Sequence, residues 1–192
     1  MKIETYIDAA FAPHRDGKSH TGAVVFIGGT AVEIITRKQK CVARDSTESE
    51  LVALSDTILD MEWHKEWFTY QGYNLGKPSI LQDNTSTISL VTQGGGKLRT
   101  RHMRARKGVV LEGYEDEAYD ITYIATDEMK ADMFTKPIDG WKFGAFSEAI
   151  MGGIDLTDEC CGQIDTASGV RCAKCVSRRR HFIHSSVCYC LE

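Results

Sequence analysis

Residues 3–37, IETYIDAAFAPHRDGKSHTGAVVFIGGTAVEIITR, decide the fold class of this chain. Ile3 to Ala10 is an apolar, β-prone run, and two further runs cover residues 22–28 and 31–37. Gly28-Gly29-Thr30 joins the last two, and such a glycine pair is a hairpin signal. The opening segment therefore predicts three strands in an antiparallel meander.

A helix is predicted directly after the meander, over residues 46–70. Its apolar positions Leu51, Leu54, Ile58, Met61 and Trp67 recur at helical spacing. Ser46 or Thr47 would serve as the N-cap, and Gly72 follows the end of the pattern. This is the longest periodic segment and is expected to be the main helix.

The elements after this helix alternate between strands and helices. Strands are expected at residues 79–82 and 119–125, and helices at 84–91, 102–114, 128–134 and 141–151. The order β-β-β-α-β-α-α-β-α, followed by the last helix at 141–151, predicts an α/β fold with a mixed sheet of five strands, in which parallel strands extend the meander and helices flank the sheet. Periodicity fades after Met151, so we expect one domain at 1–151 and a cysteine-rich tail at 152–192.

Composition limits the classes of protein that this chain can be. Its 192 residues allow one catalytic domain, and 42% hydrophobic with 26% charged residues is typical of a globular protein. No apolar run approaches the roughly 20 residues of a membrane span, and the start MKIETYIDAAF lacks the features of a secretory signal. We therefore expect an intracellular protein, in the cytoplasm or the nucleus.

Cysteines are concentrated at the end of the chain. Cys41 is the one cysteine in the first 159 residues, which fits a reducing compartment. The tail carries Cys172-x-x-Cys175 followed by histidines and cysteines, which could ligate zinc, although only one pair has a standard spacing. We expect a disordered or non-native tail, with a small zinc site or a disulfide framework as the alternatives.

Four acidic residues are candidates for a metal site: Asp8, Glu50, Asp83 and Asp132. Asp8 lies inside an apolar strand, where an unpaired charge costs several kcal/mol. The others lie at a strand end or a helix start, where functional sites form in open α/β sheets. Taken singly, Asp83 could be a helix N-cap, Glu50 a complement to the helix dipole and Asp132 a surface charge.

Taken together, the four acids predict a site for divalent cations. Clustered carboxylates are tolerated where a cation neutralises them, and hard oxygen ligands select Mg²⁺ or Mn²⁺. Two such ions about 4 Å apart can cleave a phosphodiester without a protein nucleophile. No serine, cysteine or histidine nucleophile motif is present, as this chemistry allows.

A basic segment separates two of these acids. No Asp or Glu occurs from Asn84 to Leu111, although the net charge of the chain is −4. The segment is either a solvated helix face or a surface that binds nucleic-acid phosphates. Its candidate contacts are Asn84, Thr85, Lys97, Arg99, Arg101, His102, Arg104, Arg106 and Lys107. Asn84, Thr85 and backbone groups near Ala9 and Ala10 are the candidates for contacts to the sugars.

Five segments, in order and spacing, resemble the ribonuclease H domain of copia-type retrotransposon polyproteins. They are YIDAAFA (6–12), TRKQKCVARDSTESELVALSD (36–56), ILQDNTSTISL (80–90), TRHMRARKGVV (100–110) and YIATDEMKADMFTKPIDGWKF (123–143). The resemblance covers about residues 3–151, and it implies a retroelement particle as a further possible compartment. It implies that Asp8, Glu50, Asp83 and Asp132 bind two Mg²⁺ or Mn²⁺ ions and that the chain cleaves the RNA strand of an RNA/DNA hybrid.

The resemblance also favours Glu50 over Glu48. The family's helix glutamate is followed by an apolar residue, a variable residue and alanine, as in Glu50-Leu51-Val52-Ala53. Cellular relatives carry a histidine in the loop before the last aspartate, whereas residues 125–128 here, ATDE, have none. A role of histidine in proton transfer is therefore not expected, and His102 is assigned to phosphate contact or packing.

Three hypotheses for function follow. We expect a hybrid-cleaving endonuclease that is a piece of a larger polyprotein, with a reverse transcriptase domain as its partner. A catalytically inactive nucleic-acid-binding domain derived from a retroelement is the first alternative, which loss of an acid would have favoured. The second is another nuclease or transposase of this fold, such as an integrase, but the position of Glu50 after the meander argues against it.

Overall fold

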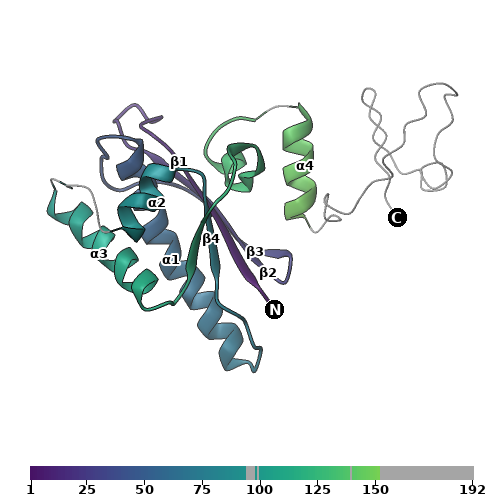
Figure 1. The fold of residues 1–192 in the computed structure, drawn as a ribbon. Helices are drawn as coiled ribbons and strands as arrows, with labels where there is room; N and C mark the ends of the chain where they lie inside the picture. The colour runs from purple at the N-terminus through teal and green to yellow at the C-terminus, as the bar shows by residue number, and fades with distance from the viewer. Residues whose placement is uncertain (94–97, 99, 139, 152–192) are drawn as a thin grey trace, which may run out of the picture.

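A computed structural model describes residues 1–93, 98, 100–138 and 140–151 of the chain. Figure 1 shows the arrangement, which begins with strands β1 (Ile3–Ala10), β2 (His20–Ile27) and β3 (Thr30–Lys38). Helix α1 (Ser46–Tyr70), strand β4 (Ser79–Gln82), helices α2 (Thr85–Thr92) and α3 (Arg101–Glu115) and strand β5 (Asp120–Tyr123) follow. Two 3₁₀ turns, η1 (Thr126–Glu128) and η2 (Lys130–Phe134), lead to helix α4 (Gly140–Ile150).

The five strands form one mixed sheet in the order β3-β2-β1-β4-β5. β1, β2 and β3 pair antiparallel, whereas β4 pairs parallel with β1 and with β5. Pairing of β1 with β4 ends at Tyr6 and Leu81, so both strands run on beyond their shared ladder. The connections leave these two strands toward opposite edges of the sheet. This switch point is where open α/β sheets place their sites.

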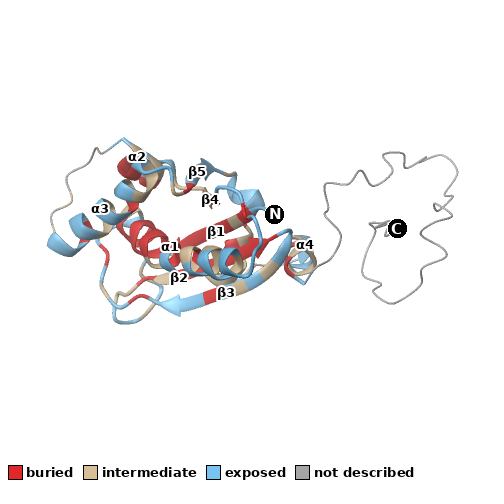
Figure 2. Ribbon diagram, turned by 90° about the horizontal axis from the view of Figure 1, so that it is seen from below, coloured by how far each residue is buried: buried red, intermediate tan, exposed pale blue. Residues whose placement is uncertain are grey.

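Alternate residues of β1 and β2 face two different layers. Ile3, Ile7, Ala23 and Val25 pack with α1 and its neighbours α2 and α3 on one face of the sheet. Tyr6, Val24 and Phe26 pack on the other face with residues from η2 and the end of α4. Figure 2 shows the buried residues of β1, β2 and α1 between the layers. Asp8 shares the parity of Tyr6 and so faces η2.

Helix α1 begins and ends for identifiable reasons. Asp45 is the N-cap, and its carboxylate accepts a hydrogen bond of 2.8 Å from the Glu48 backbone N–H. The prediction of Ser46 or Thr47 at this position was wrong, because Asp45 is extended and its oxygen reaches the first turn. The helix ends before Gly72, whose φ of 89° favours glycine.

The predicted fold class and element order are confirmed, with differences at the ends of elements. The segment expected to be one short helix at residues 128–134 forms the 3₁₀ turns η1 and η2. Residues 152–192, including the candidate zinc ligands, lie outside the described part of the chain, so the domain boundary and the character of the tail stay predictions. Among the residues that the structure describes, no helix combines the length and apolarity needed to cross a membrane.

Candidate metal centre

Three of the four predicted acids meet at the switch point of the sheet. One carboxylate oxygen from each of Asp8, Asp83 and Asp132 lies within 4.8 Å of the other two. Asp8 comes from β1, Asp83 follows β4 and Asp132 lies in η2. Asp8 is 6% exposed and Asp132 is 1% exposed, so the surface-charge interpretation of Asp132 is wrong.

Glu50 lies beside this trio but outside it. Its two carboxylate oxygens accept hydrogen bonds from the Ala9 backbone N–H, at 3.2 Å, and from Gln82 Nε2, at 3.1 Å. These donors belong to β1 and β4 beyond their shared ladder, so Glu50 spans the gap between the two strands. Glu48 points elsewhere, as expected, and accepts from the Arg44 backbone N–H at 3.0 Å.

A glycine allows η2 to reach Asp8. Gly22 is the β2 neighbour of Asp8 across the ladder. A Cβ added at Gly22 would lie 2.5 Å from Thr135 Cγ2 and 2.9 Å from the Ala131 carbonyl oxygen. No side chain fits there without moving this segment. The absence of a side chain at Gly22 therefore leaves the space in which η2 packs against the sheet and places Asp132 beside Asp8.

Hydrogen-bond donors orient the carboxylates of Asp8, Glu50 and Asp83. The Thr126 hydroxyl donates to Asp83 Oδ2 at 2.9 Å, and the Thr135 hydroxyl donates to Asp8 Oδ2. Gln82 is fully buried; its Oε1 accepts from the Asp83 backbone N–H, at 2.8 Å, while its amide nitrogen holds Glu50. Sequence reasoning did not identify Gln82, Thr126 or Thr135, because their roles depend on contacts between distant segments. A glutamine directly before the strand-end aspartate was the one available signal.

Asp83 is free of the capping role that its position suggested. The cap of α2 is Asn84, whose side-chain oxygen accepts from the Thr87 backbone N–H at 3.1 Å. The N-cap interpretation of Asp83 is therefore wrong. Since Asn84 satisfies the helix, the Asp83 carboxylate remains directed at the other acids.

Electrostatics in the cluster favours binding of a cation. Burial raises the pKa of Glu50 well above its ordinary value, and the charges of Asp8 and Asp83 raise it further. Burial also raises the pKa of Asp8, with Asp132 and Asp83 adding to the rise against the opposing Thr135 hydroxyl and Lys136. A divalent cation would relieve this repulsion.

The donor set fits Mg²⁺ or Mn²⁺. All candidate ligands are carboxylate oxygens, which these hard cations prefer. Oxygens at about 2.1 Å from one octahedral Mg²⁺ lie about 3.0 Å apart when adjacent and about 4.2 Å apart when opposite, so a group within 4.8 Å would contract around a bound cation. Lys136 Nζ lies 2.9 Å from Asp132 Oδ1, which shows that a cation is accommodated at this edge.

The predicted nucleic-acid contacts do not all lie on one exposed surface. Lys97 and Arg99 lie outside the described residues. Arg101, His102 and Arg104 are exposed on α3, and Thr85 is exposed at the start of α2. Arg106 forms an ion pair with Asp56 of α1, and Lys107 is partly buried. The basic segment therefore divides into an outward-facing part and an arginine that fastens α3 to α1.

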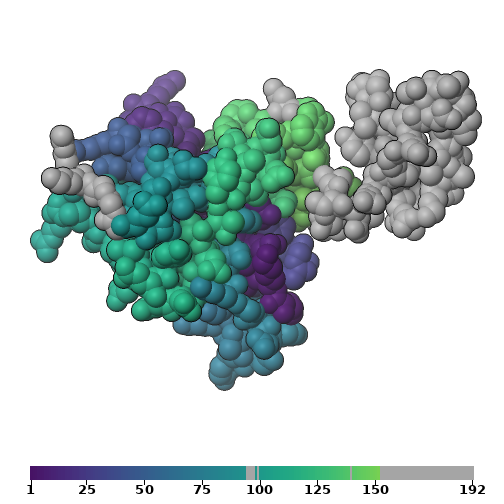
Figure 3. Space-filling view, in the orientation of Figure 1, coloured from purple at the N-terminus to yellow at the C-terminus, as the bar shows by residue number. Residues whose placement is uncertain are grey.

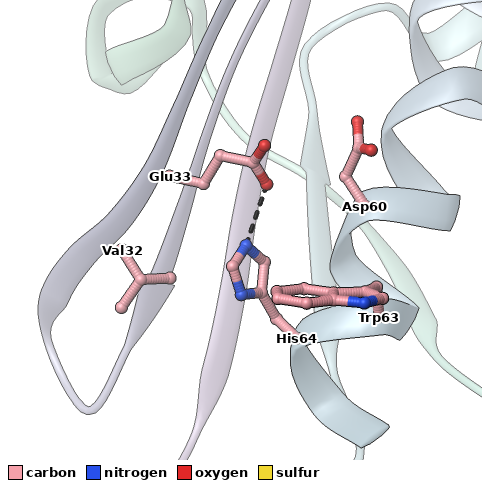
Figure 4. Close-up of a pocket in the computed structure, with 5 residues that line it drawn as sticks. All are labelled: Val32, Glu33, Asp60, Trp63 and His64. Atoms are coloured by element: carbon pink, nitrogen blue, oxygen red, sulfur yellow. Dashed lines mark hydrogen bonds and ion pairs between the residues drawn. The ribbon is translucent and has the colours of Figure 1, made fainter. Parts of the chain in front are cut away.

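A separate cavity of about 250 Å³ lies between β3 and the C-terminal half of α1 (Figure 4). Its lining residues are Val32, Glu33, Asp60, Trp63 and His64. His64 Nε2 lies 2.9 Å from Glu33 Oε2, and Asp60 pairs with Arg37 at 3.2 Å. None of the predicted carboxylates lines this cavity, and both of its acids already have partners.

Comparison with known proteins gave related sequences and related folds. No protein-family model matches the chain. A retrovirus-related Pol polyprotein from transposon TNT 1-94 of Nicotiana tabacum is 32% identical over 149 residues, which cover 77% of this chain and 11% of the relative. The Pol polyprotein from transposon RE2 of Arabidopsis thaliana is 27% identical over 164 residues, covering 84% and 11% respectively. The chain thus spans about a tenth of the length of these relatives.

Two solved structures share the fold. LC11-RNase H1, isolated from compost by a metagenomic approach, superposes with a TM-score of 0.54 at 14% identity, covering 69% of this chain and 91% of that protein. The same protein in complex with an RNA/DNA hybrid gives a TM-score of 0.52 at 12% identity, covering 69% and 92%. At these identities the likeness concerns the fold.

Proposed function

Since this chain is a ribonuclease H-like domain that matches the Pol polyproteins of copia-type retrotransposons over most of its length, we propose that it hydrolyses the RNA strand of RNA/DNA hybrids. The observation that carries the proposal is the meeting of Asp8, Asp83 and Asp132 within 4.8 Å at the switch point of the sheet. A purely structural role does not explain three clustered acids, two of them buried.

The site would hold two Mg²⁺ or Mn²⁺ ions on Asp8, Glu50, Asp83 and Asp132. Bound there, the cations would supply an activated water and stabilise the leaving oxygen of the phosphodiester. Glu50 would join the trio by exchanging one of its present hydrogen-bond donors for a cation. The proposed products carry 3′-hydroxyl and 5′-phosphate ends, as the resemblance implies.

The remaining residues of the site position these ligands. Thr126 and Thr135 fix the orientation of Asp83 and Asp8, so fewer conformations are lost when a cation binds. Gln82 links Glu50 to the backbone after β4 and so couples both sides of the switch point. The buried position of Asp132 excludes water from part of the site, which strengthens electrostatic interactions within it.

The proposed substrate is an RNA/DNA hybrid duplex that is bound through its sugar-phosphate backbone. The similar fold of LC11-RNase H1 has been solved with an RNA/DNA hybrid, which supports this substrate class. Exposed Arg101 and Arg104 on α3 would neutralise phosphates, a contact that carries no sequence information. Distinction between RNA and DNA would come from the 2′-hydroxyl and the minor groove.

The relatives place such a domain within a longer polyprotein. We propose that a reverse transcriptase domain of the same polyprotein is the partner of this chain. Removal of template RNA during reverse transcription would then be its biological task.

Cleavage of labelled substrates tests the proposal. We expect the full chain to cut the RNA strand of a hybrid when Mg²⁺ or Mn²⁺ is present, and to leave duplex DNA intact. Binding of the hybrid with no cleavage at any cation concentration would instead support the inactive nucleic-acid-binding domain.

A further inference from the structure

Asp132 faces two lysines, one at each carboxylate oxygen. Lys136 Nζ lies 2.9 Å from Oδ1, and Lys142 Nζ lies 3.8 Å from Oδ2. Lys136 follows η2, whereas Lys142 projects from α4, and Figure 3 shows the residues of η2 and α4 gathered at one edge of the molecule. The least exposed acid of the trio therefore meets ammonium groups from two segments.

The two lysines differ in how firmly they are held. The Lys142 side chain is 18% exposed; its Nζ also lies 3.1 Å from the Thr126 carbonyl oxygen and 3.3 Å from Asp127 Oδ1. The Lys136 side chain is 47% exposed, and its ammonium reaches Asp132 at the end of a flexible stem. Lys142 is thus fixed by several contacts that fasten α4, whereas Lys136 can leave with little rearrangement.

We propose that the Lys136 ammonium is a displaceable counter-ion, which holds Asp132 in the carboxylate cluster until a divalent cation takes its place. This inference rests on the metal centre of the proposed function. Three carboxylates within 4.8 Å repel one another, and the Lys136 charge offsets part of that repulsion. Lys136 is accordingly a positioning residue that acts through Asp132.

Charge and distance determine whether Asp132 binds the Lys136 ammonium or a divalent cation. A divalent ion at about 2.1 Å from an oxygen attracts it roughly three times as strongly as a single charge at 2.9 Å in the same medium. Mg²⁺ or Mn²⁺ would therefore displace the ammonium once its own hydration is replaced by the other carboxylates. The released side chain would extend into solvent, to which it is already half exposed.

Calorimetric titration of Mn²⁺ into the full chain tests the displacement. We expect Lys136→Met to bind Mn²⁺ about fivefold more tightly than the unmodified chain, because the ion pair that competes with the metal for Asp132 is removed. A factor of about five is the upper range of what a partly exposed ion pair contributes. Lys136→Arg keeps the charge and should stay within about twofold of the unmodified chain. The matched control is Lys130→Met: this η2 lysine bonds the Tyr6 hydroxyl at 2.8 Å, and its removal changes net charge equally.

Chemical labelling of the unmodified chain gives an answer that does not depend on a variant folding. With acetic anhydride and peptide mass spectrometry, we expect Mg²⁺ to increase labelling of Lys136 while leaving Lys130 and Lys142 unchanged. Unaltered labelling of Lys136 at saturating Mg²⁺ would overturn the displacement. Equal Mn²⁺ affinity of Lys136→Met and Lys130→Met would do the same.

The outcomes separate this inference from the proposed function. A chain that binds Mn²⁺ and releases Lys136 but cuts no hybrid would support the displacement and refute the proposed activity. A chain that binds no Mn²⁺ would refute the metal centre and the displacement together.

Discussion

Gly22→Ala tests whether the approach of η2 to the sheet builds the site. The new Cβ would lie 2.5 Å from Thr135 Cγ2, 2.9 Å from the Ala131 carbonyl oxygen and 3.0 Å from Phe134 Cβ. Carbon atoms pack at about 3.5–4.0 Å, so the η2 segment must retreat by about 1 Å. Such overpacking costs about 1–3 kcal/mol, which lowers Tm by about 2–12 °C for a domain of this size.

The same retreat carries Asp132 away from Asp8. Because a shift of about 1 Å can cost 10²-fold in a preorganised site, we expect Mn²⁺ affinity and cleavage to fall by about that factor. Melting curves followed by circular dichroism and calorimetric titration of Mn²⁺ measure the two effects.

Gly144→Ala is the matched control for this substitution. Gly144 lies on the exposed side of α4, and a Cβ there meets no atom within 4 Å. The control should stabilise the helix by about 0.5–1 kcal/mol and leave Mn²⁺ binding unchanged. If Gly22→Ala matches it in Tm and Mn²⁺ affinity, the close contact does not determine the site.

Three further predictions concern other parts of the chain. Truncation after Met151 should preserve cleavage, because all four acids precede it. Loss of activity in the truncated protein would contradict this, especially if a chelator reproduces the loss in the full chain and zinc restores it. Replacing three arginines of the basic segment by glutamine (Arg99, Arg101 and Arg104) should raise KM at constant kcat and reduce the slope of log affinity against log salt by about 2 to 3, from about 0.9 per phosphate. An unchanged salt slope would show that this surface is only solvated. Because the pKa values of Asp8 and Glu50 are raised in the folded state, the cation-free protein should lose stability as the pH rises from about 4 through those values. The affinity for Mg²⁺ should increase over the same range, since the carboxylates lose their protons. Melting curves at about pH 5 and pH 8, with and without Mg²⁺, measure both changes.

Local patterns were sufficient to predict the sheet, the main helix and three acids that the structure brings together. Asp8 stood out as a charge within an apolar strand, and Asp83 and Asp132 as acids where elements begin or end. The pattern of the sequence left open which polar group caps a helix when several are adjacent. In the structure, Asp45 and Asn84 are the N-caps of α1 and α2, so the Asp83 carboxylate is available to the metal centre.

The supporting residues of the site could not be predicted, because they depend on tertiary contacts. Gly22 meets residues more than a hundred positions away, and only the folded structure shows that its missing Cβ admits η2. The basic run likewise gave no sign that Arg106 pairs with Asp56 whereas Arg101 is exposed. Periodicity locates elements, but it does not tell which side chains of a charged run face a neighbouring helix.

The most direct test of the central claim compares Asp83→Asn with Asp127→Asn in cleavage of a hybrid with labelled RNA. Asp83 belongs to the carboxylate trio, whereas the nearby Asp127 side chain is 92% exposed and lies outside it. With Mg²⁺ present, we predict that Asp83→Asn slows RNA-strand cleavage by at least about 10²-fold at a nearly unchanged Tm, since it removes a ligand of the cations. Asp127→Asn should cut at close to the unmodified rate. Cleavage by Asp83→Asn at the unmodified rate would contradict the assignment of the site.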